Sequence, residues 1–136
     1  PWVNEVLLDA NEVLVIAYPD LVNLRNTQAI FDRFMDKRNV DAPTRLILNR
    51  VGMAKRTELG PNDFKGPVTM TPTLNIPFEP NLYGMALNNG KSVVEENKRA
   101  KSTKLFDELA KIVSGRMQSE KQRPGRMVPN FLRSDK

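Results

Sequence analysis

The 136-residue chain contains no cysteine and no histidine. A thiol nucleophile, an imidazole base and a zinc site built from these residues are therefore excluded. The acid pairs Glu95–Glu96 and Asp107–Glu108 are adjacent, so their side chains would point in different directions, and we interpret them as solvated charges. We accordingly predict no catalytic residue and no metal ligand in this chain.

The run GMALNNGKS at residues 84–92 is close to the pattern of a phosphate-binding loop. That loop has four residues between its first glycine and its Gly-Lys pair, and it leads from a strand into a helix. Here five residues separate Gly84 from Gly90, and the preceding segment has a helical pattern. We therefore predict a helix that ends at Gly90 in a left-handed cap, followed by a surface residue, Lys91.

Asn49 and Arg50 come near the end of an apolar run at residues 45–51. Open α/β sheets bind ligands outside the carboxyl ends of their strands. The asparagine amide offers one acceptor and two donors, which complement the N6 donor and N7 acceptor of adenine. A polar residue at a strand end is more often a turn former, so the residues alone leave both interpretations open.

The segment IPFEPN at residues 76–81 leaves a neighbouring predicted strand at the same edge. Pro77 and Pro80 stiffen this segment, and Phe78 offers a flat apolar surface. A stiff apolar wall suits a planar base, although proline-rich strand exits also occur without a ligand.

The elements that would position these segments follow from hydrophobic periodicity. Continuous apolar runs, typical of strands buried on both faces, predict strands at residues 12–18 and 45–51. Residues 73–77 predict a third, short strand. Helical patterns predict helices at residues 2–10, 21–38, 61–64, 82–89 and 102–115. We expect Asp20 and Ser102 to cap the second and the last of these helices. The core stripe expected on the second helix consists of Leu21, Leu24, Phe31, Phe34 and Met35.

This order of elements predicts an α/β fold with parallel strands and right-handed crossovers. Three strands are few for such a sheet, so we expect the later half of a doubly wound domain, with its first strands upstream of Pro1. No apolar run reaches the length of about 18–20 residues that a membrane span needs.

The net charge of +5 is unevenly distributed along the chain. Residues 116–136 contain six cations and two acids, which leaves the remaining body at +1. We therefore expect attraction to anionic partners to come from this tail. Pro124 and Pro129 and the lack of periodicity predict a flexible extension.

The chain resembles the C-terminal half of MinD/ParA-type ATPases in a series of sequence runs that occur in the same order. These runs are VLVIAYPDLVNLRNTQAIFDRF, RLILNRVG, IPFEPNLYGMALNNGKSVVE and STKLFDELAKIV. Within that group they are most similar to the CpaE/TadZ branch of Flp (tight-adherence) pilus assembly proteins. The resemblance covers about residues 1–114. It implies a three-layer, mainly parallel sheet of the deviant-Walker P-loop ATPase type, incomplete here, at residues 1–115, followed by the basic flexible tail at 116–136.

The resemblance also implies ATP or ADP with magnesium as the cofactor of the complete domain. The phosphate-binding lysines and the magnesium-binding aspartate of the family lie upstream of the equivalent of Trp2, so this chain alone should be inactive. The residues that match the family's adenine-facing side are Asn49, Arg50, Pro77, Phe78 and Glu79.

The implied role is nucleotide-dependent association in a CpaE/TadZ-like protein that localises or assembles a Flp (type IVb) pilus secretion machine. The implied partners are a second copy and proteins of that machine, in the cytoplasm or peripherally at the inner face of the membrane or the cell pole. One alternative is a ParA-like partition ATPase that binds nucleic acid, which the single tail aromatic, Phe131, makes less favoured. The other is an interaction module without a nucleotide site.

Overall fold

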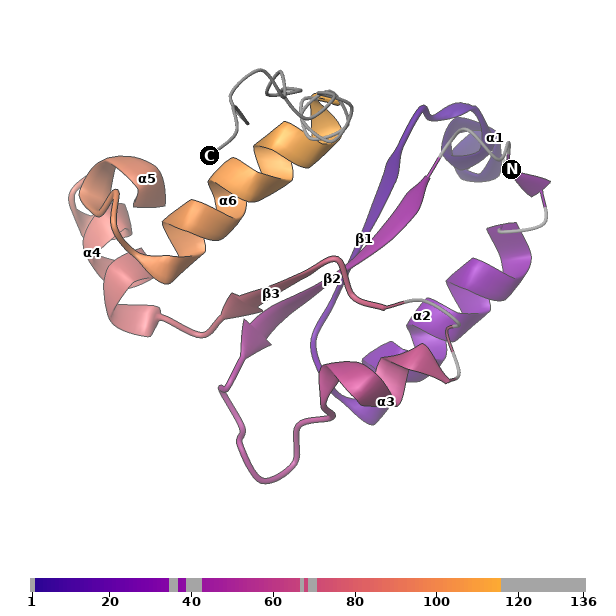
Figure 1. Ribbon diagram of the computed structural model, residues 1–136, viewed down its shortest axis with the longest axis horizontal. Helices are drawn as coiled ribbons and strands as arrows, with labels where there is room; N and C mark the ends of the chain where they lie inside the picture. The colour runs from indigo at the N-terminus through magenta and orange to yellow at the C-terminus, as the bar shows by residue number, and fades with distance from the viewer. Residues whose placement is uncertain (1, 35–36, 39–42, 67, 69–70, 116–136) are drawn as a thin grey trace, which may run out of the picture.

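The computed structural model describes residues 2–34, 37–38, 43–66, 68 and 71–115 (Figure 1). The expected tail at 116–136 lies outside the described residues. The elements, in chain order, are α1 (Trp2–Asp9), β1 (Val13–Ala17), α2 (Leu21–Phe34), β2 (Thr44–Val51), α3 (Pro61–Lys65), β3 (Leu74–Pro77), α4 (Pro80–Asn88), α5 (Val93–Glu96) and α6 (Lys101–Val113).

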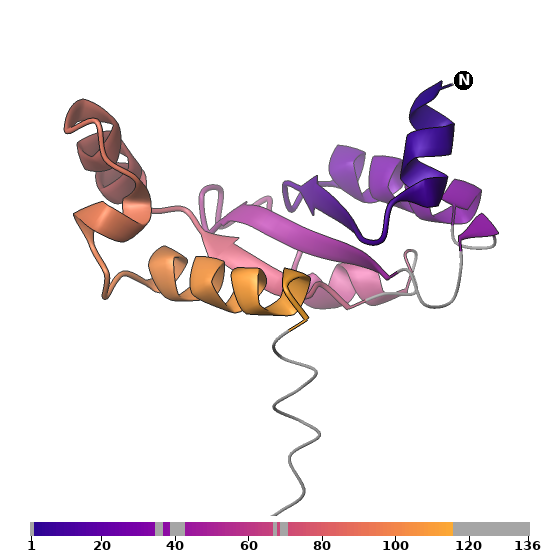
Figure 2. The same ribbon diagram turned by 90° about the horizontal axis from the view of Figure 1, so that it is seen from above.

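The three strands form one parallel sheet in the order β1-β2-β3, which confirms the predicted α/β class. Ile16 of β1 pairs with Ile47 of β2, and Leu48 pairs with Asn75 of β3. Figure 2 shows α2 and α6 on opposite sides of this sheet. Because all strands run in the same direction, their carboxyl ends meet at one edge, where Asn49 and the exit from β3 both lie.

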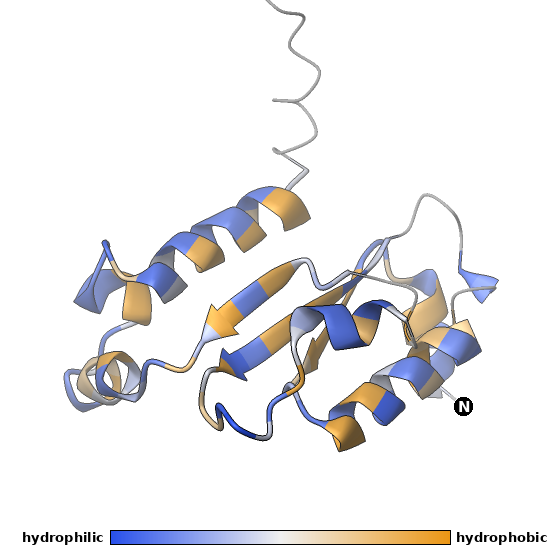
Figure 3. Cartoon of the chain, turned by 60° about the horizontal axis from the view of Figure 1, so that its bottom comes forward, coloured by the Kyte–Doolittle hydropathy of each residue, from blue (hydrophilic) through white to orange (hydrophobic). Residues whose placement is uncertain are grey.

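The two faces of the sheet bury separate apolar clusters, and Figure 3 shows the apolar residues along the strands and on one side of α6. On one face, Leu46 and Leu48 pack with Phe31 of α2 and Phe64 of α3. On the other face, Ile47 packs with residues of β3 and α6. The middle strand is therefore buried on both faces, as its continuous apolar run predicts.

The same expectation is wrong for β1. Its run is equally apolar, yet the side chain of Ile16 is 63% exposed. Ile16 lies beside Ile47 on the face that α6 covers, but the apolar cluster on that face includes Leu14 of β1 and not Ile16. Apolar continuity therefore identified the strand but not how far this face of it is covered.

The buried side of α2 is narrower than expected. Leu24, Thr27 and Phe31 are buried, whereas Leu21, the first residue of the helix, is 53% exposed. Met35 lies outside the described residues.

Helix α5 was not predicted at all, although its capping box, formed by Ser92 and Glu95, is a recognisable start signal.

Asp20 caps α2 as expected. Its Oδ1 accepts hydrogen bonds from the backbone N–H of Asn23 at 2.6 Å and from Asn23 Nδ2 at 2.9 Å. These bonds stabilise the charged carboxylate and lower the pKa of Asp20. The stabilisation is therefore present above the ordinary aspartate pKa and is lost as the pH falls through the lowered one.

Asp20→Ala is expected to lower the free energy of unfolding at pH 7 by about 1 kcal/mol, because an N-terminal backbone donor loses its partner. Urea unfolding measures this change. Asp32→Ala, which removes an exposed acid from the same helix, is the matched control and should cost less. Equal costs for the two variants at pH 7 would contradict the capping role.

Candidate functional site

A cleft of about 460 Å³ lies at the carboxyl ends of β2 and β3. This volume is within the range of about 300–1,000 Å³ that is typical of small-molecule sites. The cleft brings together all five residues that the sequence singled out for base binding. The complete lining is Asn49, Arg50, Met53, Pro77, Phe78, Glu79, Pro80 and Tyr83.

A β-bulge in β2 forms the floor of this cleft. The register passes from Leu48 opposite Asn75 to Val51 opposite Pro77, so Asn49 and Arg50 together face a single residue of β3. Arg50 has a φ of 57°, in the left-handed region that non-glycine residues rarely adopt. Such a conformation costs on the order of 1–3 kcal/mol, and bulges of this kind commonly redirect a side chain next to a binding site.

The Asn49 amide is held in part by its own backbone. Its Oδ1 accepts the N–H of Arg50 at 2.9 Å, which is the local bond of a turn former. An amide oxygen has a second lone pair, and the two Nδ2 donors take no part in that bond. The asparagine can therefore shape the bulge and still offer a donor and an acceptor to a ligand.

The wall of the cleft is the exit from β3. The backbone N–H of Phe78 donates to Val51 O at 2.9 Å, which ties this exit to the end of β2. The Phe78 side chain is 41% exposed and so has a free apolar surface. Pro80 begins α4, and one turn later the N–H of Tyr83 donates to Glu79 O at 3.2 Å.

Two residues of the cleft were missed by the sequence analysis. Tyr83 lies in the first turn of α4, which directly follows the β3 exit, and its aromatic type next to that segment was the signal that could have found it. Met53 lies in the turn after β2, where its backbone N–H donates to Arg50 O at 3.2 Å, and no periodic pattern marks it.

Glu79 proves to be a structural link between two elements. Its Oε2 accepts the backbone N–H of Ser102 at 3.1 Å and the Ser102 hydroxyl at 2.6 Å. Ser102 was expected to cap α6, but the helix already begins at Lys101 and Ser102 is fully buried inside its first turn. The carboxylate of Glu79 therefore caps α6 from outside and fixes the β3 exit against it.

A second carboxylate shapes the loop that follows β2. Glu58 accepts the N–H of Gly52 at 2.7 Å and the N–H of Ala54 at 2.8 Å. These donors, Ala54 above all, lower the pKa of Glu58. Burial raises the pKa of Tyr18, and so do the neighbouring charges of Glu58 and Asp20.

Glu58 should make the loop beside the cleft sensitive to acid. Because its pKa is lowered by folding, its contribution is present above the ordinary glutamate pKa and is lost as the pH falls through the lowered value. Glu58→Gln should therefore destabilise the protein at pH 7 and lose that effect in acid. Urea unfolding at pH 7 and in acid measures the loss of stability, with a substitution of the exposed Glu108, Glu108→Gln, as the control. If Glu58→Gln destabilised the protein equally at both pH values, this role would be contradicted.

The remaining motifs have structural roles. Gly84 lies within α4 and Gly90 follows it with a φ of 61°, which confirms the helix cap in place of a phosphate loop. Asp107 and Glu108 are exposed on α6 as expected. Glu95 is exposed and Glu96 is half-buried, and each also accepts a local hydrogen bond, from Ser92 and from Asn89 respectively.

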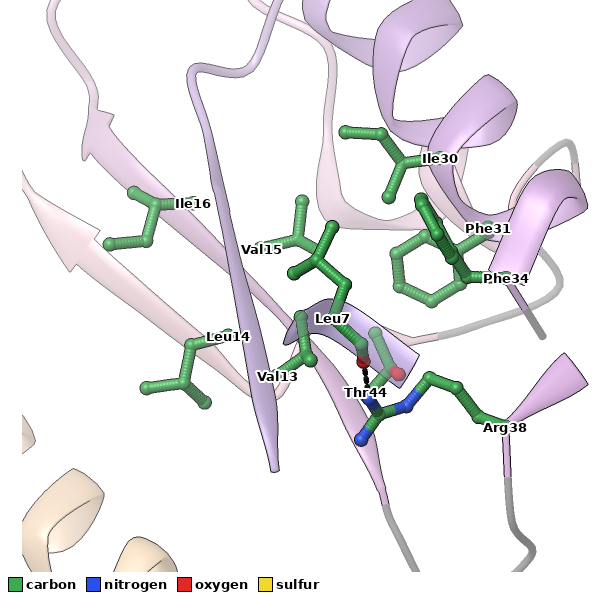
Figure 4. A pocket seen from close by; sticks show the side chains of 10 residues that line it. All are labelled: Leu7, Val13, Leu14, Val15, Ile16, Ile30, Phe31, Phe34, Arg38 and Thr44. Atoms are coloured by element: carbon green, nitrogen blue, oxygen red, sulfur yellow. Dashed lines mark hydrogen bonds between the residues drawn. The ribbon is translucent and has the colours of Figure 1, made fainter. Parts of the chain in front are cut away.

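A separate cavity of about 310 Å³ lies between α1, β1 and α2 (Figure 4). Its lining is apolar apart from Thr44 and Arg38, and Arg38 donates to the carbonyl oxygens of Leu7 and Ala10 at the end of α1. This cavity offers packing surface and no reactive group.

In the described ranges, no three potential metal-ligating side chains gather, and no helix is long and apolar enough to cross a bilayer.

No family model matches this sequence, and no curated protein matches it. Among solved structures, the chain is similar to a ParA family ATPase from Chlorobium tepidum TLS, with a TM-score of 0.58 and 17% sequence identity. The similarity covers 69% of this chain and 38% of that chain. The fold is that of part of a ParA-type domain. The expected fold class is thereby confirmed, and the chain spans well under half the length of that ATPase.

Proposed function

We propose that this chain is the base-binding part of a nucleotide-binding domain of the MinD/ParA type. The observation that carries the proposal is the meeting of Asn49, Arg50, Pro77, Phe78 and Glu79 around one cleft at the carboxyl edge of a parallel sheet. The ParA family ATPase that shares the fold supports a nucleotide as the ligand class.

The residues of the cleft suit adenine in complementary ways. The Asn49 amide would meet the N6 and N7 edge of the base. Pro77 and Phe78 would pack against its faces, and Tyr83 lines the same cleft. Glu79 would act indirectly, because its bonds to α6 keep the wall in place.

The phosphates and magnesium would be held by residues outside this cleft. The only near-match to a phosphate loop, at residues 84–92, is a helix end. Phosphate loops bind through a ring of backbone N–H groups and a lysine, which supply much of the affinity for a nucleotide. We therefore expect this chain by itself to bind nucleotides through the base alone and to be inactive as an ATPase.

Calorimetry tests that expectation. AMP, ADP and ATP should bind to the 136-residue chain with similar, weak affinity, and magnesium should make no difference. Micromolar binding of ATP that depends on magnesium would contradict it, because it would require a phosphate site among these residues.

For the whole protein we propose a CpaE/TadZ-like role, in which nucleotide-dependent association helps to localise or assemble a Flp (type IVb) pilus secretion machine. The support is the ordered series of sequence runs from residue 13 to residue 113. A second copy and components of that machine are the proposed partners, at a cytoplasmic or peripheral membrane location. Co-purification with the pilus machine tests this role, and selective recovery of DNA would favour the partition alternative.

A further inference from the structure

The positive charge of the body is concentrated in one segment. Residues 91–104 contain five cations and two acids, a net charge of +3, although residues 1–115 together carry only +1. The near-neutral average of the body therefore conceals a local basic region. All five cations are exposed, and within the described structure none forms a salt bridge: Lys91, Lys98, Arg99, Lys101 and Lys104.

The two acids of this segment are engaged in local hydrogen bonds. Glu95 accepts the backbone N–H and the hydroxyl of Ser92, both at 2.8 Å. Glu96 accepts from Asn89 Nδ2 at 3.0 Å. Both carboxylates serve to hold α5 in place and pair with none of the cations by a salt bridge, so the segment presents a surplus of positive charge.

Exposed apolar residues lie on the adjoining helix. In α4, the side chain of Met85 is 55% exposed and that of Leu87 is 81% exposed. The Asn89–Glu96 bond joins the end of α4 to α5, and the Thr103 hydroxyl donates to Asn97 O at 2.7 Å, which joins α5 to α6. Figure 2 shows that α4 and α5 project from one end of the molecule beside the start of α6. We name residues 85–104 the α4–α5 tip.

We propose that the α4–α5 tip is a docking surface for an anionic lipid membrane. The exposed cations would lie among the lipid headgroups, and Leu87, the more exposed of the two apolar residues, would reach the acyl boundary. A projecting tip suits a broad surface better than a peptide, which needs a groove. Single-stranded nucleic acid is disfavoured because its binding sites combine cations with stacking aromatics, and the exposed large residues here are leucine and methionine.

Sedimentation of the 136-residue chain with vesicles tests the proposal. Vesicles of phosphatidylcholine with phosphatidylserine should bind the chain, and pure phosphatidylcholine should bind it much more weakly. Each cation near an anionic surface contributes about 5-fold to binding, so Lys98→Glu/Arg99→Glu should lower the partition coefficient by at least about 25-fold.

The matched control is Arg25→Glu/Lys65→Glu, which makes the same change of charge on α2 and α3 and keeps the sequence at 116–136. It should leave vesicle binding nearly unchanged. Equal binding by the two double variants would overturn the proposal, because the tail or the overall charge would then explain the attraction.

A spectroscopic variant tests the apolar contact directly. Leu87→Trp in a Trp2→Phe background places one fluorophore on the tip. Its emission should shift to shorter wavelength with anionic vesicles and stay unchanged with duplex DNA. An emission that stays unchanged with vesicles would overturn the proposal and indicate that the tip does not dock on membranes. A shift with DNA but not with vesicles would overturn it in favour of nucleic acid as the partner.

Discussion

Glu79→Ala should lower the free energy of unfolding by about 2–4 kcal/mol, because it leaves two donors of Ser102 without their acceptor inside the protein. Ser102 is fully buried, so water cannot easily replace the lost carboxylate. The substitution also frees the exit of β3 from α6. Urea unfolding monitored by circular dichroism measures the change.

Two further variants separate this cap from a general effect of charge. Glu79→Gln keeps an acceptor oxygen and should cost much less than the alanine variant. Glu108→Ala removes an exposed acid from α6 and should have little effect. A small cost for Glu79→Ala, close to that of Glu108→Ala, would show that the bonds to Ser102 do not stabilise the fold.

Asn49→Ala should weaken ATP binding by about 1–3 kcal/mol in a domain that includes the phosphate site, which is the range for a good bidentate contact to a base. ADP binding should weaken equally, because the contact is made to adenine and not to the γ-phosphate. GTP has an acceptor, O6, where adenine has a donor, so the preference for ATP over GTP should shrink. Competition binding of the two nucleotides measures both effects.

The turn-former interpretation of Asn49 predicts a different outcome. Loss of its bond to the Arg50 N–H would lower the melting temperature and leave the preference for ATP over GTP intact. Measuring stability and selectivity on the same variant therefore distinguishes the two roles. A reduced melting temperature with an unchanged ATP/GTP ratio would contradict base binding by Asn49.

The strands and long helices could be predicted because their signals are local. The continuous run of β2 identified a strand that the structure buries on both faces, and glycines at the ends of α4 and α6 marked where those helices stop. The exposure of Ile16 could not be predicted in this way, because it depends on which helix covers that face of β1. Residue type along one strand carries no information about its neighbours.

The candidate site was predictable to the extent that parallel strands end at a common edge. That rule is enough to bring Asn49 and the segment around Phe78 together. The role of Glu79 could not be predicted, because its partner, Ser102, is 23 residues away in the sequence. Serine is also a residue type that itself caps helices, so Ser102 gave no sign of needing a partner. Long-range bonds of this kind have no local pattern, so only the fold reveals them.

The most direct test of adenine binding in the cleft is a titration of the isotope-labelled chain with adenosine, followed by nuclear magnetic resonance of its backbone amides. We expect concentration-dependent shifts that are centred on Asn49, Arg50, Phe78 and Tyr83, and weaker shifts with guanosine at the same concentration. Absence of shifts, or shifts centred on the cavity beside β1, would contradict the account.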